Sequence, residues 1–281
     1  MLGPLTLAGG EAQAANYPPK PPYGRTKYGL CVWRHPGENY ATALARQTAA
    51  LGQPEVLRYF YGPNPLVWPA EGGATGNISL IVSFKRRPID VLNGIHDAEI
   101  SAWLAKLPTT RRTWIAYEHE MDVKVQRHEY ELEDVRNAFI RITKLIRAAK
   151  NPRLRATMIL TGYRYAERLP LYWPGSENVD VLAVDTYQWD AETVESMITT
   201  NLAVARQYKK PFGLSEFGLW KGSDAERAAR ITEAIQRAHN NYTFVAYFDA
   251  DRTDVESDHD WEISDLPLSS AAWRDAIAAT R

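Results

Sequence analysis

The chain has 281 residues, of which 45% are hydrophobic and 24% are charged. Its 33 Lys and Arg side chains nearly balance 34 Asp and Glu, so the net charge of -1 gives no field that would attract nucleic acid or an anionic membrane. The single cysteine, Cys31, excludes an intramolecular disulfide. This length is typical of one large α/β barrel domain, and the balanced charge favours a neutral or mixed substrate.

Residues 1–24 are expected to form a lead-in to the folded domain. Leu2 to Gly10 is mildly apolar, and Ala12-Gln13-Ala14 matches a small-x-small cleavage pattern, although no basic residue precedes it. Four prolines between positions 18 and 22 then favour a stiff, extended segment. The lead-in is interpreted either as export-signal-like, which would make the protein secreted or cell-surface, or as a disordered tail. No apolar run approaches the roughly 18 residues of a membrane-spanning helix.

Residues 25–281 show short apolar, β-rich runs that alternate with amphipathic helical stretches. Eight such runs are counted: Tyr28 to Trp33, Val56 to Tyr61, Ile78 to Phe84, Thr113 to Glu118, Arg155 to Thr161, Val179 to Asp185, Phe212 to Glu216, and Thr243 to Phe248. Most are continuously apolar, as parallel strands covered on both faces should be. The pattern predicts an α/β fold consisting of a single (β/α)8 TIM barrel. A doubly wound open sheet is disfavoured because no Gly-rich phosphate motif follows any strand.

Helical periodicity fits between most of these strands. Asp97 can cap a helix whose apolar face holds Ile100, Trp103 and Leu104. Further helices are predicted over Val135 to Ile146, Thr193 to Tyr208, Ala225 to His239 and Ser269 to Ala279. The connection from Gly62 to Asn77 looks irregular because it contains Pro and Gly, so its helix is expected to be short or missing.

Polar residues at the ends of the predicted strands indicate where the chemistry would occur, because a barrel places its site at the carboxyl ends of its strands. They include Trp33-Arg34-His35, Arg58, Glu118-His119-Glu120, Asp185 to Trp189, and Glu216. Glycoside cleavage requires one carboxylic acid to protonate the leaving oxygen and one carboxylate to attack the anomeric carbon or activate water. Glutamates at the ends of strands four and seven could supply both groups.

These residues resemble those of retaining glycoside hydrolases of clan A, and most nearly family 26, which includes β-mannanases. The resemblance implies that Glu120, preceded by His119, is the acid/base and that Glu216, in Ser-Glu-Phe-Gly, is the nucleophile. It also implies that Tyr187 hydrogen-bonds the nucleophile and that Trp189 helps form the sugar-binding floor. The expected enzyme is an endo-acting, retaining β-glycosidase that degrades mannan or a related β-glycan.

The chain departs from the family pattern after the His-Glu pair, where Asn, Gly and aromatic residues are replaced by Met121, Asp122 and Val123. Glu118 is an alternative proton donor, because residues two apart on a strand point to the same side. If Glu120 is the donor, Glu118 is expected one layer deeper in the barrel, bonded to Arg58. Two neighbouring carboxylates would also raise the pKa of one of them.

Aromatic side chains near strand ends are candidates for stacking on sugar rings. Trp33, Trp189 and Trp220 are preferred, Trp261 is a weaker candidate, and Trp103, Trp114 and Trp273 are expected to serve packing. Arg34 and His35 could bond sugar hydroxyls or brace the barrel mouth.

Two other functions stay open at this stage. A metal-dependent isomerase or lyase could use Glu118, Glu120, Asp185 and Glu216 as oxygen ligands with His119 nearby, although no His-x-His pair is present. The second alternative is a catalytically inactive barrel that binds carbohydrate. The acidic run from Asp249 to Asp260 is interpreted as a solvated loop rather than a calcium site. We expect no cofactor or metal, a carbohydrate partner, and a monomer.

Overall fold

A closed barrel of eight parallel strands forms the centre of the computed structural model, which describes residues 25–62, 66, 68, 76–188, 193–251 and 259–281. The strands follow chain order around the barrel, and β1 closes it by pairing with both β2 and β8. Their bounds are β1 Lys27–Val32, β2 Val56–Tyr61, β3 Ser79–Phe84, β4 Thr113–Tyr117, β5 Leu154–Thr161, β6 Val181–Tyr187, β7 Phe212–Gly218 and β8 Phe244–Asp249.

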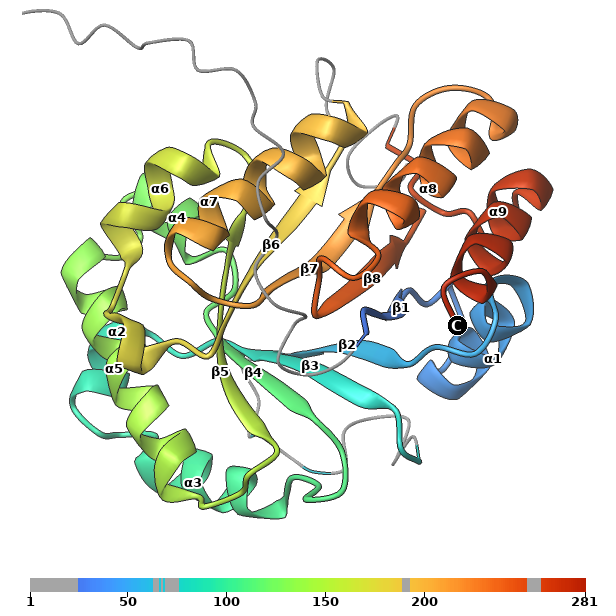
Figure 1. The fold of residues 1–281 in the computed structure, drawn as a ribbon. Coiled ribbons are helices and arrows are strands. Elements are labelled where there is room, and N and C mark those ends of the chain that lie inside the picture. The colour runs from blue at the N-terminus through green and yellow to red at the C-terminus, as the bar shows by residue number, and fades with distance from the viewer. Residues whose placement is uncertain (1–24, 63–65, 67, 69–75, 189–192, 252–258) are drawn as a thin grey trace, which may run out of the picture.

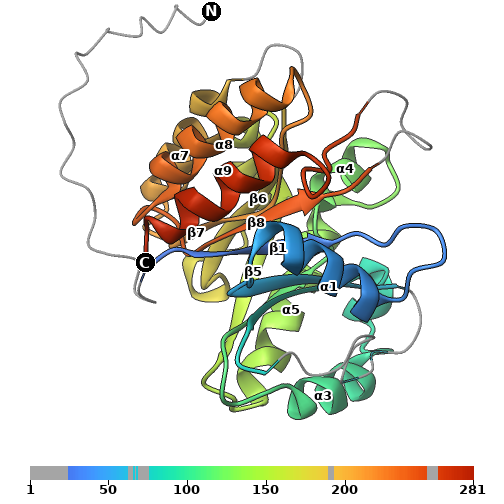
Figure 2. The same ribbon diagram turned by 90° about the vertical axis from the view of Figure 1, so that its right-hand side faces the viewer.

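The helices lie around the outside of the barrel (Figures 1 and 2). Their bounds are α1 Tyr40–Leu51, α2 Pro88–Leu92, α3 Asp97–Lys106, α4 Met121–Gln126, α5 Leu132–Ala148, α6 Tyr165–Tyr172, α7 Asn201–Gln207, α8 Asp224–Ala238 and α9 Pro267–Ala278. A 3-10 turn, η1 Ser176–Asn178, precedes β6, and a π-helical turn, η2 Ser196–Thr200, runs directly into α7. A capping box between Ser223 and Glu226 begins α8, as expected where a side chain satisfies the first orphan N–H groups.

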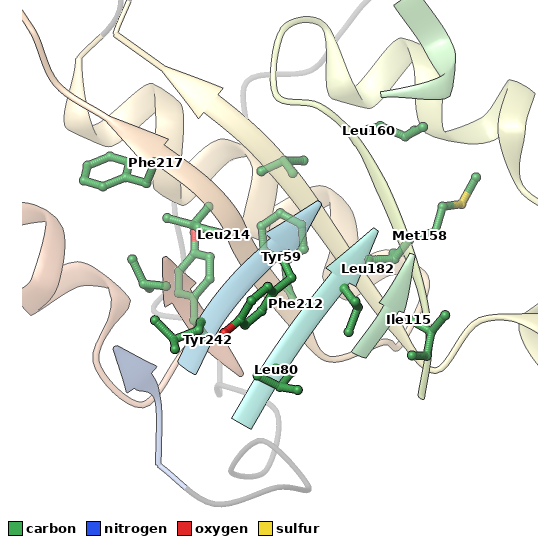
Figure 3. Packing of buried hydrophobic residues seen from close by; sticks show 14 of the residues in the cluster. Tyr59, Leu80, Ile115, Met158, Leu160, Leu182, Phe212, Leu214, Phe217 and Tyr242 are labelled. Atoms are coloured by element: carbon green, nitrogen blue, oxygen red, sulfur yellow. The ribbon is translucent and has the colours of Figure 1, made fainter. Parts of the chain in front are cut away.

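Alternating residues of each strand face two different apolar layers. Leu80 on β3, Ile115 on β4 and Leu182 on β6 belong to the outer layer between strands and helices, part of which Figure 3 shows. A smaller cluster fills the inside of the barrel, where Trp114 packs against Phe244 with ring centroids 4.7 Å apart. Burial on both faces explains why the strands are apolar along nearly their whole length.

The predicted (β/α)8 fold is confirmed, and all eight predicted strands are present within a few residues of their expected bounds. The helix expected over Thr193 to Tyr208 divides into η2 and α7. No helix is described between β2 and β3, and residues 63–65, 67 and 69–75 of that connection lie outside the described residues.

Strand β7 contains one extra residue relative to both of its neighbours. Its register shifts after Leu214, so that Asp185 on β6 pairs with Glu216, and Ser215 is the inserted residue. Phe212, Leu214 and Phe217 all belong to the outer layer. Simple alternation would therefore turn Glu216 outward with Phe212 and Leu214. The bulge reverses this alternation and directs Glu216 into the barrel mouth.

Candidate active site

A cleft of about 1220 Å³ opens at the carboxyl ends of the strands. Residues from β1, β2 and β4 to β8, or from the segments that follow them, line it. Its floor includes the carboxyl groups of Glu120, Asp185 and Glu216. The two glutamates expected from the sequence to share a site are therefore brought together by strands that are nearly 100 residues apart in the chain.

Glu216 is held by two side chains from other strands. The Tyr187 hydroxyl at the end of β6 donates a short hydrogen bond to Oε2, and Arg58 Nη2 on β2 lies 3.4 Å from Oε1. Arg58 is fully buried and also donates to Ser83 Oγ at 2.5 Å. Both carboxylate oxygens of Glu216 thus have a donor, which fixes the orientation of the carboxylate.

Glu120 lies at the turn from β4 into α4. Its backbone is left-handed, with φ 55°, and its N–H donates to the Ile159 carbonyl on β5 at 3.0 Å. Burial, followed by repulsion from Glu216, raises the pKa of Glu120 to about 7. A non-glycine residue in the left-handed region is uncommon and is often found at functional sites. The Glu120 carboxyl group is therefore able to hold its proton near neutrality.

Asp185 is a third carboxyl group in the same cluster. Ser215 Oγ donates to Asp185 Oδ1 at 2.5 Å, and the Cys31 thiol donates to the Ser215 carbonyl at 3.4 Å. Burial, followed by repulsion from Glu216, raises the pKa of Asp185 well above its ordinary value. Arg58 is a cation that opposes this repulsion, and it lowers the pKa of both Asp185 and Glu120. Such crowding favours a protonated form of the carboxyl groups around Glu216.

His119 lines the cleft next to Glu120. Its ring lies 5.4 Å from the ring of Phe60, and burial together with the charges of Arg58 and Lys85 lowers its pKa well below the ordinary value. His119 is therefore neutral near pH 7 and can act as a hydrogen-bonding group rather than as a cation.

Glu118 does not occupy the position expected from the sequence. Strand β4 ends at Tyr117, and Glu118 has a left-handed backbone with φ 46°, so the strand alternation does not extend to it. Neither of its oxygens has a hydrogen-bond partner among the described residues, whereas Arg58 bonds to Ser83 and Glu216. The prediction that Glu118 bonds to Arg58 is therefore wrong.

Groups that favour the charged form of Glu118 lie near its carboxyl group without forming a hydrogen bond to it. Burial raises its pKa to about 7, against the opposing charge of Lys85 and the nearby backbone N–H of Arg86. The repulsion expected between Glu118 and Glu120 is instead contributed to Glu120 by Glu216 and Asp122.

Aromatic rings cover one wall of the cleft. The Tyr187 ring lies 5.3 Å from Phe248 and 5.1 Å from Trp261, and Trp33 lies 6.2 Å from Phe248. All four line the cleft, including Trp261, which the sequence made only a weaker candidate. They form an aromatic wall of tilted and edge-on rings next to Glu216.

The other expected binding residues are more scattered. Arg34 lines the cleft and is exposed. His35 Nε2 lies 2.8 Å from Glu262 Oε2, which places it in a bracing contact at the mouth. Trp220 donates from Nε1 to the Gln188 carbonyl at 2.6 Å and packs against His259. Trp189 lies outside the described residues.

Several residues of this site were not predicted from the sequence, among them Phe248 in the aromatic wall. Ser215 supplies the bulge, and Phe60 and Tyr163 expose aromatic rings on the cleft. The signal for Tyr163 was present, because an aromatic residue stands two positions beyond the end of the fifth predicted strand. The described residues contain no group of three or more His, Cys, Asp or Glu side chains arranged to hold a metal ion. None of the described helices combines the length and apolarity needed to cross a bilayer.

No protein-family model matches the chain, and no curated protein is significantly similar to it in sequence. Solved structures do resemble it. A GH26 β-mannanase from Bacteroides ovatus is 13% identical, with a TM-score of 0.60 over 91% of this chain and 89% of that chain. A GH128 endo-β-1,3-glucanase from Amycolatopsis mediterranei in complex with laminaritriose is 15% identical, with a TM-score of 0.55 over 89% of this chain and 99% of that chain.

A GH128 exo-β-1,3-glucanase from Blastomyces gilchristii is also 15% identical, with a TM-score of 0.58 over 88% of this chain and 97% of that chain. These likenesses extend over nearly the whole described barrel. By its strand order and by these comparisons, the chain has the (β/α)8 fold found in clan A glycoside hydrolases.

Proposed function

We propose that the protein is a retaining β-glycoside hydrolase that cleaves within a glycan chain, with Glu216 as nucleophile and Glu120 as acid/base. The observation that carries the proposal is the difference between the two carboxyl groups. Glu216 receives donors from Tyr187 and Arg58, whereas Glu120 is desolvated, lies near Glu216 and has a pKa raised to about 7. Groups whose environments favour opposite protonation states are suited to nucleophile and acid.

In the first step a Glu216 oxygen attacks the anomeric carbon. The bond from that carbon to the leaving oxygen breaks, and the leaving oxygen takes the proton of Glu120. In the second step the Glu120 carboxylate removes a proton from water, the water oxygen bonds to the anomeric carbon, and Glu216 leaves as a carboxylate. Arg58 and Tyr187 would stabilise the Glu216 charge before the first step and after the second.

Support for a glycan substrate comes from the aromatic wall and from the structural neighbours. Flat rings on Trp33, Phe248 and Trp261 suit the apolar faces of sugar rings. The cleft of about 1220 Å³ is large enough for several sugar units, which supports internal cleavage. The named neighbours act on β-mannan and β-1,3-glucan, and these polymers are the first substrates to test.

The test measures reducing ends released from carob galactomannan, laminarin and other β-glycans by wild type, Glu120→Ala and Glu216→Ala. Glu133→Ala is the matched control, because this glutamate is exposed on α5. We expect product from wild type and the control only. Addition of azide to Glu120→Ala should yield a β-glycosyl azide, because azide can attack the glycosyl-enzyme without a general base.

Several outcomes would contradict the proposal. Equal activity in all four proteins would remove both glutamates from the mechanism. An α-glycosyl azide would contradict retention. Loss of activity with a chelator and recovery with a divalent cation would favour a metal-dependent enzyme, and glycan binding without turnover by wild type would indicate a binding protein.

A further inference from the structure

Exposed aromatic rings occur on the cleft beyond the wall described above. Six large hydrophobic side chains are exposed among the described residues, and two of the six, Phe60 and Tyr163, are aromatic. Both line the cleft, with exposed fractions of 46% for Phe60 and 59% for Tyr163. Large apolar surface that stays exposed at a cleft is typical of ligand contact.

The guanidinium group of Arg168, which also lines the cleft, lies over the Tyr163 ring. The guanidinium carbon of Arg168 lies 5.4 Å from the centre of the Tyr163 ring, within the range of a cation–π contact. Arg168 donates to Asp122 Oδ2 at 2.5 Å and to Gln126 Oε1 at 3.2 Å, and also to Thr161 Oγ1. The Tyr163 ring therefore contacts a cation that is held in place and still has a large exposed area.

Asp122 anchors this arrangement below the surface. Its side chain is fully buried, and it accepts from the Thr161 N–H at 3.2 Å and from the Thr161 hydroxyl at 2.5 Å as well as from Arg168. A buried carboxylate with three donors is held in one position. This network joins α4 to the end of β5 and holds Arg168 in place beside Tyr163.

The elements that carry this network adjoin Glu120. Helix α4 begins at Met121, directly after Glu120, and Tyr163 follows β5, the strand next to β4. Gln126 and Arg127 at the end of α4 also line the cleft there. The acid of a glycosidase protonates the oxygen of the leaving group, so the sugar ring attached to that oxygen lies on the acid's side of the site.

We propose that Tyr163, held by Arg168, is the stacking platform of a leaving-group subsite that takes a pyranose ring on the reducing-end side of the cleaved bond. This inference rests on the proposed glycosidase function. The apolar face of the sugar would lie on the Tyr163 ring, and Gln126 and Arg127 would offer polar groups to its hydroxyls. Tyr163 binds and orients the leaving sugar and takes no part in bond breaking.

The test compares two kinds of substrate that share the same cleavage site. Mannohexaose and laminarihexaose place a sugar in the leaving-group subsite, whereas β-mannobiosyl fluoride and β-laminaribiosyl fluoride place only fluoride there, which has no ring to stack. Kinetics are measured for wild type, Tyr163→Ala, Tyr163→Phe and the control Leu171→Ala, which alters another exposed side chain on α6. Tyr163→Phe keeps the ring and removes only the hydroxyl.

We expect Tyr163→Ala to lower kcat/KM for the hexaose by about tenfold, which corresponds to about 1.4 kcal/mol. The same variant should cleave the glycosyl fluoride with little change. Tyr163→Phe, which keeps the ring, should retain most of the hexaose activity, and Leu171→Ala should match wild type on both substrates. An equal loss on both substrates, or no loss on the hexaose, would overturn the subsite and leave the glycosidase function standing. A wild-type protein that cleaves neither pair would overturn the proposed function, and the subsite with it.

Discussion

Replacing Glu118 by Gln should stabilise the protein at alkaline pH. Burial raises the pKa of Glu118 from 4.5 to about 7, and neither oxygen has a hydrogen-bond partner among the described residues. Because the pKa in the folded state is raised, the wild-type protein has a stability contribution that is fully present below about pH 4.5 and is lost as the pH rises through about 7. Each pKa unit corresponds to about 1.4 kcal/mol, so ionised Glu118 costs about 3 kcal/mol at about pH 8.

Urea unfolding followed by tryptophan fluorescence measures this difference. The free energy of unfolding of Glu118→Gln should exceed that of wild type by about 3 kcal/mol at about pH 8 and by less than about 1 kcal/mol at about pH 4.5. Glu133→Gln, at an exposed position of α5, should follow wild type at both values. A difference between Glu118→Gln and wild type that does not change with pH would refute the buried, ionising carboxyl described here. Glu118→Gln should also retain activity, because Glu120 is the proposed donor.

Three further predictions concern the acid, the nucleophile and the packing of the barrel. The value of kcat/KM should fall as the pH rises above about 7, because the pKa of Glu120 is raised to about 7 and its proton is needed for the first step. A pH profile that stays flat to about pH 9 would contradict this role. Tyr187→Phe should lower kcat by about 10- to 100-fold, since it removes the donor to Glu216 Oε2, and steady-state kinetics showing an unchanged kcat would contradict the contact. Gly29→Ala should destabilise the fold by about 3 kcal/mol or more, because a Cβ there would lie 1.7 Å from the Val56 carbonyl oxygen. Gly62 has open space around it, so the control Gly62→Ala should change the melting temperature little.

The strands could be predicted from the sequence because burial on both faces imposes a strong and continuous requirement for apolar residues. The same requirement does not reveal where a strand loses its regular alternation. Ser215 in β7 and the left-handed backbone at Glu118 and Glu120 leave no mark in hydrophobic periodicity, since each depends on contacts with neighbouring strands. The sequence therefore predicted that Glu120 and Glu216 lie in one cleft, but it did not predict the position of Glu118.

The aromatic side chains show a second limit of sequence reasoning. A tryptophan near a strand end can lie in the cleft or in a side contact, and only loop geometry decides between them. Trp33 and Trp261 line the cleft, whereas Trp220 turns to the Gln188 carbonyl. The role proposed for Tyr163 depends on Arg168, which lies five positions further along the chain and is held by Asp122 from a different helix. Such an arrangement is visible only in three dimensions.

The bulge at Ser215 makes the position of Glu216 a matter of residue count as well as residue type. If β7 kept all its residues but paired without the bulge, Glu216 would turn toward the surrounding helices and Phe217 would enter the barrel mouth, whereas deleting Ser215 would leave Leu214 facing outward and Glu216 facing inward. A point substitution at Ser215 would leave the count unchanged. Any redesign of this strand must therefore either keep the register shift or remove Ser215 altogether, because regular pairing of all seven residues would turn Glu216 away from the cleft.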